Sequence, residues 1–167
     1  LKDRIAKITL EEMQLYGGRG RGLLTLDGTA QTPVAGANLT LDGISAGPLL
    51  KDALGFDWLE GRGTIALALA GQGASERQMI ETLNGKVDMS TVNGAISGFD
   101  VGKLLRTLEQ GRIPDLGISA GEKTPFSELA GSHIITNGVA RNQDLRLVSP
   151  NLRVTGSGTV NLGARSL

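Results

Sequence analysis

Few side chains in this sequence are of the kinds that perform covalent or metal chemistry. The chain of 167 residues has no cysteine and one histidine, His133. The lack of cysteine excludes a thiolate zinc site, an iron–sulfur cluster, a disulfide framework and a cysteine nucleophile, and one histidine cannot form a multi-histidine metal site. A serine–histidine–acid triad would have to use His133. We therefore expect His133 to be structural and the protein to be non-enzymatic, with no catalytic residue, no metal site and no cofactor.

Three arginines lie where neighbouring glycines predict exposed backbone. Arg19 and Arg21 flank a glycine beside a predicted turn, and Arg62 lies between two glycines. An arginine near exposed backbone N–H groups can hold a phosphate, so these three residues are candidate contacts for a lipid headgroup. The alternative is that they form the solvated end of a hairpin.

The composition restricts the class of protein. Lys+Arg and Asp+Glu both number 17, which argues against nucleic acid as a partner because neutralising phosphates requires a basic surplus. Hydrophobic residues make up 40% and charged residues 20%, unlike a disordered tail or a bundle of membrane helices. No run approaches the roughly 18 apolar residues that cross a bilayer. With 25 glycines and only 3% aromatic residues, the sequence favours aliphatic strands joined by tight turns.

Alternating apolar residues predict two groups of strands. In the first strand the alternation shifts at Glu11 and Glu12, which predicts a β-bulge. Asn93–Gly94 is a turn dipeptide and is expected to end a strand. The predicted strands cover 5–16, 24–28, 38–43, 61–71 and 86–92, and then 133–140, 144–149 and 151–162 in a closing meander.

Three short helices are predicted between the strands. They cover 47–54, with Pro48 at the first position, 75–83, with Ser75 as the N-cap, and 98–108. The predicted fold class is α+β: an antiparallel, strongly twisted sheet of about seven to eight strands with the three helices packed on it. Because no linker divides the chain, we expect a single domain over residues 1–167. The chain starts without Met, so we expect this domain to be a fragment of a longer protein.

The alternation also predicts an apolar face on the sheet. If this face is left partly uncovered, acyl chains can lie along it away from water. The alternative is that the helices cover it and that its residues are ordinary core. The candidate lipid-binding residues are Leu24, Leu26, Leu39, Leu41, Ile65, Leu67 and Leu69.

A series of short motifs along nearly the whole chain resembles the AsmA-like C-terminal domain of the AsmA family. Each motif is weak alone because glycine and leucine are common, but their order and spacing together are specific. The motifs are Tyr16-Gly17-Gly18 followed by Leu-Thr-Leu-Asp-Gly, Leu49 to Gly55, Leu59 to Gly63, Leu83-Asn84-Gly85, Asn93 to Asp100, Lys123 to Leu129, and Ile135 to Leu162.

The resemblance implies a protein of the bacterial envelope. Members of the family resemble large periplasmic proteins that an N-terminal helix, absent from this sequence, anchors in the inner membrane. The implied function is outer-membrane biogenesis, through handling or transport of phospholipid or another envelope lipid along a β-sheet groove. A protein-docking module in outer-membrane protein assembly is the alternative, with other envelope proteins or further repeats of the same chain as partners. The family has no catalytic motif, so the resemblance gives no residue a catalytic role.

Overall fold

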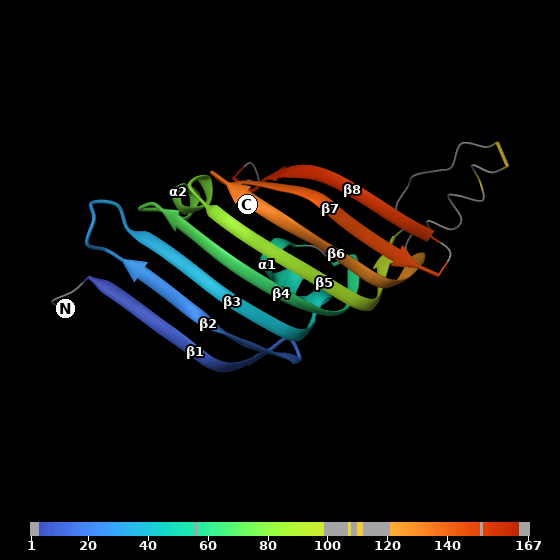
Figure 1. Cartoon of the computed structure of the whole chain (residues 1–167), viewed down its shortest axis with the longest axis horizontal. Coiled ribbons are helices and arrows are strands. Elements are labelled where there is room, and N and C mark those ends of the chain that lie inside the picture. Colours follow the sequence, from blue (N-terminus) through green and yellow to red (C-terminus); the bar gives the residue numbers. More distant parts are fainter. Residues whose placement is uncertain are drawn as a thin grey trace.

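The computed structural model describes residues 4–55, 57–98, 107, 110–111, 121–150 and 152–163, except for the side chains of residues 53 and 54. Eight strands form one antiparallel sheet in the order of the sequence, so that every strand pairs with its neighbour along the chain (Figure 1). The strands are β1 (Ile5–Leu15), β2 (Gly18–Asp27), β3 (Val34–Ser45), β4 (Leu59–Gln72), β5 (Asn84–Ser97), β6 (Lys123–Thr136), β7 (Val139–Ser149) and β8 (Leu152–Asn161).

Two short helices lie in the connections on either side of β4. Helix α1 (Ala46–Leu54) follows β3, and Gly55, which ends it, has a left-handed φ of 70° that glycine adopts without strain. Helix α2 (Glu76–Glu81) follows β4, and the Ser75 side chain accepts a hydrogen bond from the backbone N–H of Gln78. Because α1 precedes β4 and α2 follows it, the two helices lie at opposite ends of this central strand.

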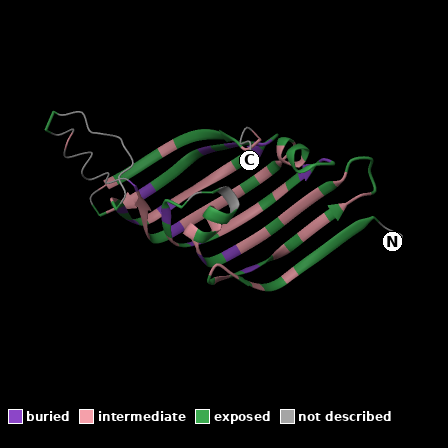
Figure 2. Ribbon diagram, turned by 180° about the vertical axis from the view of Figure 1, so that it is seen from behind, coloured by how far each residue is buried: buried purple, intermediate pink, exposed green. Residues whose placement is uncertain are grey.

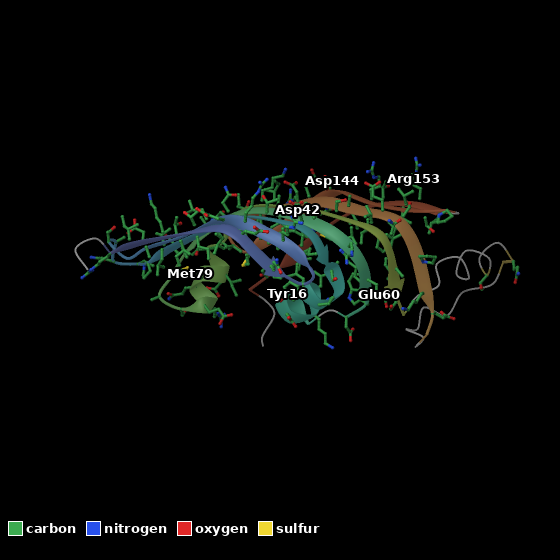
Figure 3. All side chains as sticks on the ribbon, turned by 90° about the horizontal axis from the view of Figure 1, so that it is seen from below. Tyr16, Asp42, Glu60, Met79, Asp144 and Arg153 are labelled. Atoms are coloured by element: carbon green, nitrogen blue, oxygen red, sulfur yellow. The ribbon has the colours of Figure 1, made fainter. Side chains whose placement is uncertain are left out.

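Both helices lie on the same face of an arched sheet. Seen along the sheet, the strands curve over the helices, with Tyr16 and Met79 on the helix side and Asp144 and Arg153 on the outer side (Figure 3). We call these the concave and convex faces. Helix α1 contacts β3 and β4, and α2 contacts β4. Much of the sheet between the helices is half-buried or exposed (Figure 2).

The core is small and lies beneath α1. Ile44 is fully buried and Leu59 is 2% exposed. A cluster of buried residues joins α1 to the sheet, with Leu50 and Ile96 packed against it; its members are Ala46, Leu59, Phe126, Leu129 and Leu147. A core this limited fixes one helix over one end of the central strands.

Most of the strand predictions are confirmed, including the bulge. The pairing of β1 with β2 shifts between Leu10 and Met13, where Glu11 and Glu12 were expected to break the alternation. The predicted helix at Pro48 is confirmed, but it begins at Ala46, so Pro48 is at its third position, where a missing N–H still costs no helical hydrogen bond. The predicted N-cap of the second helix at Ser75 is also confirmed.

Three predictions need correction. The single strand expected over 133–140 is wrong, because β6 ends at Thr136 and β7 begins at Val139, with the turn at Asn137 and Gly138 between them. The fold is dominated by the sheet rather than α+β with three packed helices: two helices are seen in the described part of the chain, and the third, expected over 98–108, falls almost wholly outside it. The predicted turn at Asn93 and Gly94 is wrong, because β5 runs through both residues to Ser97. Asn93 has a φ of 50° inside the strand, so the left-handed residue produces a local irregularity and not a hairpin.

Candidate functional site

The strand register brings the predicted lipid-binding residues onto one face. Two rows of directly opposed residues cross all eight strands on the concave side. One row is Ile8, Leu24, Ala37, Leu69, Gly85, Ile135, Ala140 and Val160. The other is Leu10, Gly22, Leu39, Leu67, Val87, His133, Asn142 and Gly158.

These two rows contain no charged residue. Their polar members are His133 and Asn142, and Asn142 is buried with its amide donating to the Ser132 carbonyl at 2.8 Å and its side-chain oxygen accepting from the Leu145 N–H at 3.0 Å. The convex row between them runs Thr9, Leu23, Asn38, Ala68, Lys86, Ile134, Arg141 and Thr159, and so includes two cations. The faces therefore differ in charge as the alternation predicted.

The concave side stays partly open between the helices. Leu26 is 49% exposed and Ile8 is 55% exposed, while Leu24, Leu39, Ile65, Leu67 and Leu69 are half-buried. Leu41 differs, because it is only 5% exposed and belongs to the core. We call the accessible part the concave strip, and define it as Leu24, Leu26, Leu39, Ile65, Leu67, Leu69, Val87 and Met89.

The sequence analysis overlooked two residues of the concave strip. Val87 is opposite Leu67 and Met89 is opposite Ile65, and both side chains are half-buried. They alternate with Lys86 and Asp88, which form an ion pair at 2.8 Å. The alternation of apolar and charged residues in this strand was the signal that could have identified them.

The three candidate headgroup arginines lie together, but away from the concave strip. Arg19, Arg21 and Arg62 line a hollow of about 970 Å³ at the end of the sheet where β1 turns into β2. In β2, Arg19 and Arg21 alternate with Gly20, whose added Cβ would meet the side chains of Leu41, Leu15 and Met13 on the concave side. The arginines therefore point to the convex side. The hollow is also lined by three acidic residues, Glu11, Glu12 and Asp42. The role of the three arginines as headgroup contacts stays a prediction.

The same end of the sheet is tied to α1 through Tyr16. The Tyr16 hydroxyl donates a hydrogen bond to Oδ2 of Asp52 at 2.9 Å. This hydrogen bond raises the pKa of Tyr16, with lesser contributions from desolvation and from the charge of Asp52. Tyr16 follows β1 and Asp52 lies in α1, so the contact holds the β1–β2 turn against the helix.

Neither of two candidate serines, Ser132 and Ser45, is positioned to pair with His133. Ser132 precedes it in β6, and adjacent strand residues point to opposite faces. Residues 43–47 have the Gly-x-Ser-x-Gly spacing of a hydrolase nucleophile turn, which the sequence analysis did not consider. Ser45, however, has φ −75° and ψ 111°, an unstrained extended conformation rather than the sharp turn of that motif. Ser45 is opposite Arg62, whereas His133 lies in the row of Leu67, five residues farther along β4.

The described residues hold no group of three or more histidine, aspartate or glutamate side chains that could bind a metal ion. Among the same residues, no helix is both long and apolar enough to cross a lipid bilayer.

Comparison with known proteins identifies a family. No curated protein and no solved structure gives a significant match to the chain. A family profile described as the AsmA family matches residues 4–145, from just before β1 to within β7. The match covers well over half of the sequence and includes most of the motifs that predicted it. The chain belongs to the AsmA family.

Proposed function

We propose that this chain binds lipid acyl chains on the concave strip and takes part in lipid handling in the bacterial envelope without catalysing a reaction. The observation that carries the proposal is the pair of uncharged rows that cross all eight strands, whose members in β1 to β5 are half-buried or exposed. Proteins rarely leave an apolar surface of this extent in contact with water unless it binds an apolar partner.

The chemistry of the concave strip suits an acyl chain. Seven of its eight members are leucine, isoleucine or valine and the eighth is Met89, so every contact is nonpolar. Burying apolar surface is favourable by about 25 cal/mol per Å² and is non-directional. An aliphatic lining without hydrogen-bonding groups holds a hydrocarbon chain at no fixed position along the strip, as a surface along which lipid slides would require.

Family membership supports the biological setting. The AsmA family is associated with the envelope and with outer-membrane assembly, and residues 4–145 match its profile. Within that setting we propose that the domain acts in the periplasm, on phospholipid or another envelope lipid that moves between the inner and outer membranes. Anchoring to the inner membrane would use a segment outside this sequence.

The proposal concerns acyl chains and not the headgroup. Arg19 and Arg21 point to the convex side, so a lipid lying on the concave strip would keep its headgroup away from these two residues. Any phosphate that these arginines bind would belong to a second ligand.

A matched pair of leucines in β2 tests the proposal. Leu26 is on the concave side opposite Ala35 and is 49% exposed, whereas Leu23 is on the convex side opposite Asn38 and is 37% exposed. Leu26→Asp puts a charge where an acyl chain would lie, and desolvating that charge is unfavourable. We expect Leu26→Asp to weaken binding of a fluorescent phosphatidylethanolamine at least tenfold, and Leu23→Asp to leave it within about twofold.

Because both leucines are exposed, we expect both variants to fold, and thermal unfolding checks that they do. Leu67→Asp against Ala68→Asp repeats the comparison in β4, at the centre of the concave strip. Equal binding by Leu26→Asp and Leu23→Asp, with both folded, would contradict the proposal. Loss of folding by Leu67→Asp would instead show that Leu67 belongs to the core.

A further inference from the structure

Strand β8 pairs with β7 alone among the strands of the described part of the chain. It is at the end of the sheet (Figure 1). The backbone N–H of Leu162 donates to the carbonyl of Gly138 across from it. Because successive residues of a strand alternate in direction, the even-numbered residues of β8 direct their N–H and C=O groups to β7 and the odd-numbered residues direct theirs outward.

The two edges of the sheet differ in how they resist pairing. Natural sheets protect an edge with bulges and charges. The β1 edge has both, since its bulge falls on β1 itself at Glu11 and Glu12, and Lys7 lies on the same strand. In β8 the irregularity lies on the partner strand, where two residues of β7 lie between Asn142 and Leu145 and only Ser157 of β8 lies between Gly156 and Gly158. Strand β8 is therefore regular, and its only charged residue is Arg153.

The sequence of β8 reads nearly the same in both directions. Residues 152–162 are Leu-Arg-Val-Thr-Gly-Ser-Gly-Thr-Val-Asn-Leu, centred on Ser157. If two copies of β8 lie antiparallel with Ser157 opposite Ser157, all opposed pairs but one join residues of the same type. These pairs are Gly156 with Gly158, Thr155 with Thr159, Val154 with Val160 and Leu152 with Leu162. The exception places Arg153 opposite Asn161, so no like charges meet.

We propose that two copies of this chain associate through β8, antiparallel and centred on Ser157, to form one continuous sheet. The outward backbone groups of Thr155, Ser157 and Thr159 are then the groups that hydrogen-bond between copies, with Ser157 pairing reciprocally with itself. Opposed threonines and opposed valines are favourable cross-strand pairs. A twofold axis perpendicular to the sheet keeps each face continuous, so the exposed Val154 and Val160 join concave side to concave side.

Cysteine cross-linking tests both the contact and its register, because the chain has no cysteine of its own. Residues opposed in a hydrogen-bonded pair have Cα atoms about 5.5 Å apart, within the range that a disulfide bridges. Under mild oxidation we expect Ser157→Cys to form a disulfide-linked dimer. Thr155→Cys alone should not cross-link, but an equimolar mixture of Thr155→Cys and Thr159→Cys should. Cross-linking of Thr155→Cys with itself, or none in the mixture, would overturn the proposed register.

A proline pair tests the association without any cross-link. Ser157→Pro removes the N–H at the centre of the proposed contact, where that group points outward and an edge strand tolerates proline. The control is Thr9→Pro, because Thr9 has the equivalent outward position on β1. The carbonyl of Arg4 accepts a hydrogen bond from the N–H of Gly28 and so faces β2. Thr9 is five residues after Arg4, an odd number, so its backbone groups face away from β2. By sedimentation velocity we expect the wild type and Thr9→Pro to dimerise, and Ser157→Pro to associate roughly tenfold or more weakly. A monomeric wild type, or equal dimerisation by all three proteins, would overturn the proposal.

Discussion

At the scale of single residues, several hydrogen bonds converge on one carboxylate at the irregularity in β7. The carboxylate of Asp144 accepts hydrogen bonds from the backbone N–H of Ser132 at 2.8 Å, from the Ser132 hydroxyl at 2.7 Å and from the Asn142 amide at 3.0 Å. The Ser132 backbone and hydroxyl hydrogen bonds lower the pKa of Asp144 and outweigh the small opposing effect of desolvation. Asp144 thus replaces the ladder hydrogen bonds that the shift in register between β6 and β7 removes.

This arrangement predicts a stability that depends on pH. A carboxyl group whose folded pKa is lowered stabilises the fold above its unfolded pKa of about 3.9 and loses that contribution as the pH falls through the folded value. We expect Asp144→Asn to melt at a lower temperature than the wild type at pH 7, with the difference shrinking as the pH falls below about 4. Thermal unfolding of both proteins across this range measures it. A difference that does not change with pH would mean that the shape of the side chain matters and its charge does not.

At the scale of the elements, close packing explains why β5 continues through Asn93 and Gly94. A Cβ added to Gly94 would lie 2.1 Å from the carbonyl oxygen of Glu60 and 2.4 Å from Cζ of Phe126. The neighbouring strands therefore approach so closely that only glycine fits, and the left-handed Asn93 allows the strand to pass this point.

Gly94→Ala is accordingly expected to destabilise the fold by about 1–3 kcal/mol, as other overpacked cores are destabilised. Gly28→Ala is the control, because a Cβ there meets nothing closer than 3.4 Å. Chemical denaturation of both variants measures the two free energies of unfolding. Equal values would show that the backbone at Gly94 moves aside without cost.

The same elements mark how far the sequence could predict the fold. The regular alternation of Ile65, Leu67 and Leu69 with alanines was enough to predict a strand with one leucine face, and the register confirms that face. The turn predicted at Asn93–Gly94 was wrong because a left-handed residue occurs both in hairpin turns and in irregular strands. Which of the two forms here depends on packing against Glu60 and Phe126, which are distant in the sequence. The face of Arg19 and Arg21 was also unpredictable, since the intervening glycines have no side chain to show the alternation.

At the scale of the whole molecule, the described part of the protein is one arched sheet with both helices on its concave face (Figure 3). A small core fixes α1, and both helices contact β4, one of the two central strands. The two helices therefore cover the apolar concave face only in part. The partly open concave strip follows from the topology, since α1 and α2 lie in the connections at opposite ends of β4 and the side chains of Ile65, Leu67 and Leu69 between those ends are only half-buried.

The central claim is that the concave strip holds acyl chains, and native mass spectrometry of the purified chain tests it most directly. We predict a population whose added mass equals an intact diacyl lipid at fixed stoichiometry, identified after solvent extraction. Leu26→Asp should lose this population and Leu23→Asp should retain it. A wild-type protein that gives only its bare mass, even after incubation with phosphatidylethanolamine vesicles, would contradict the account.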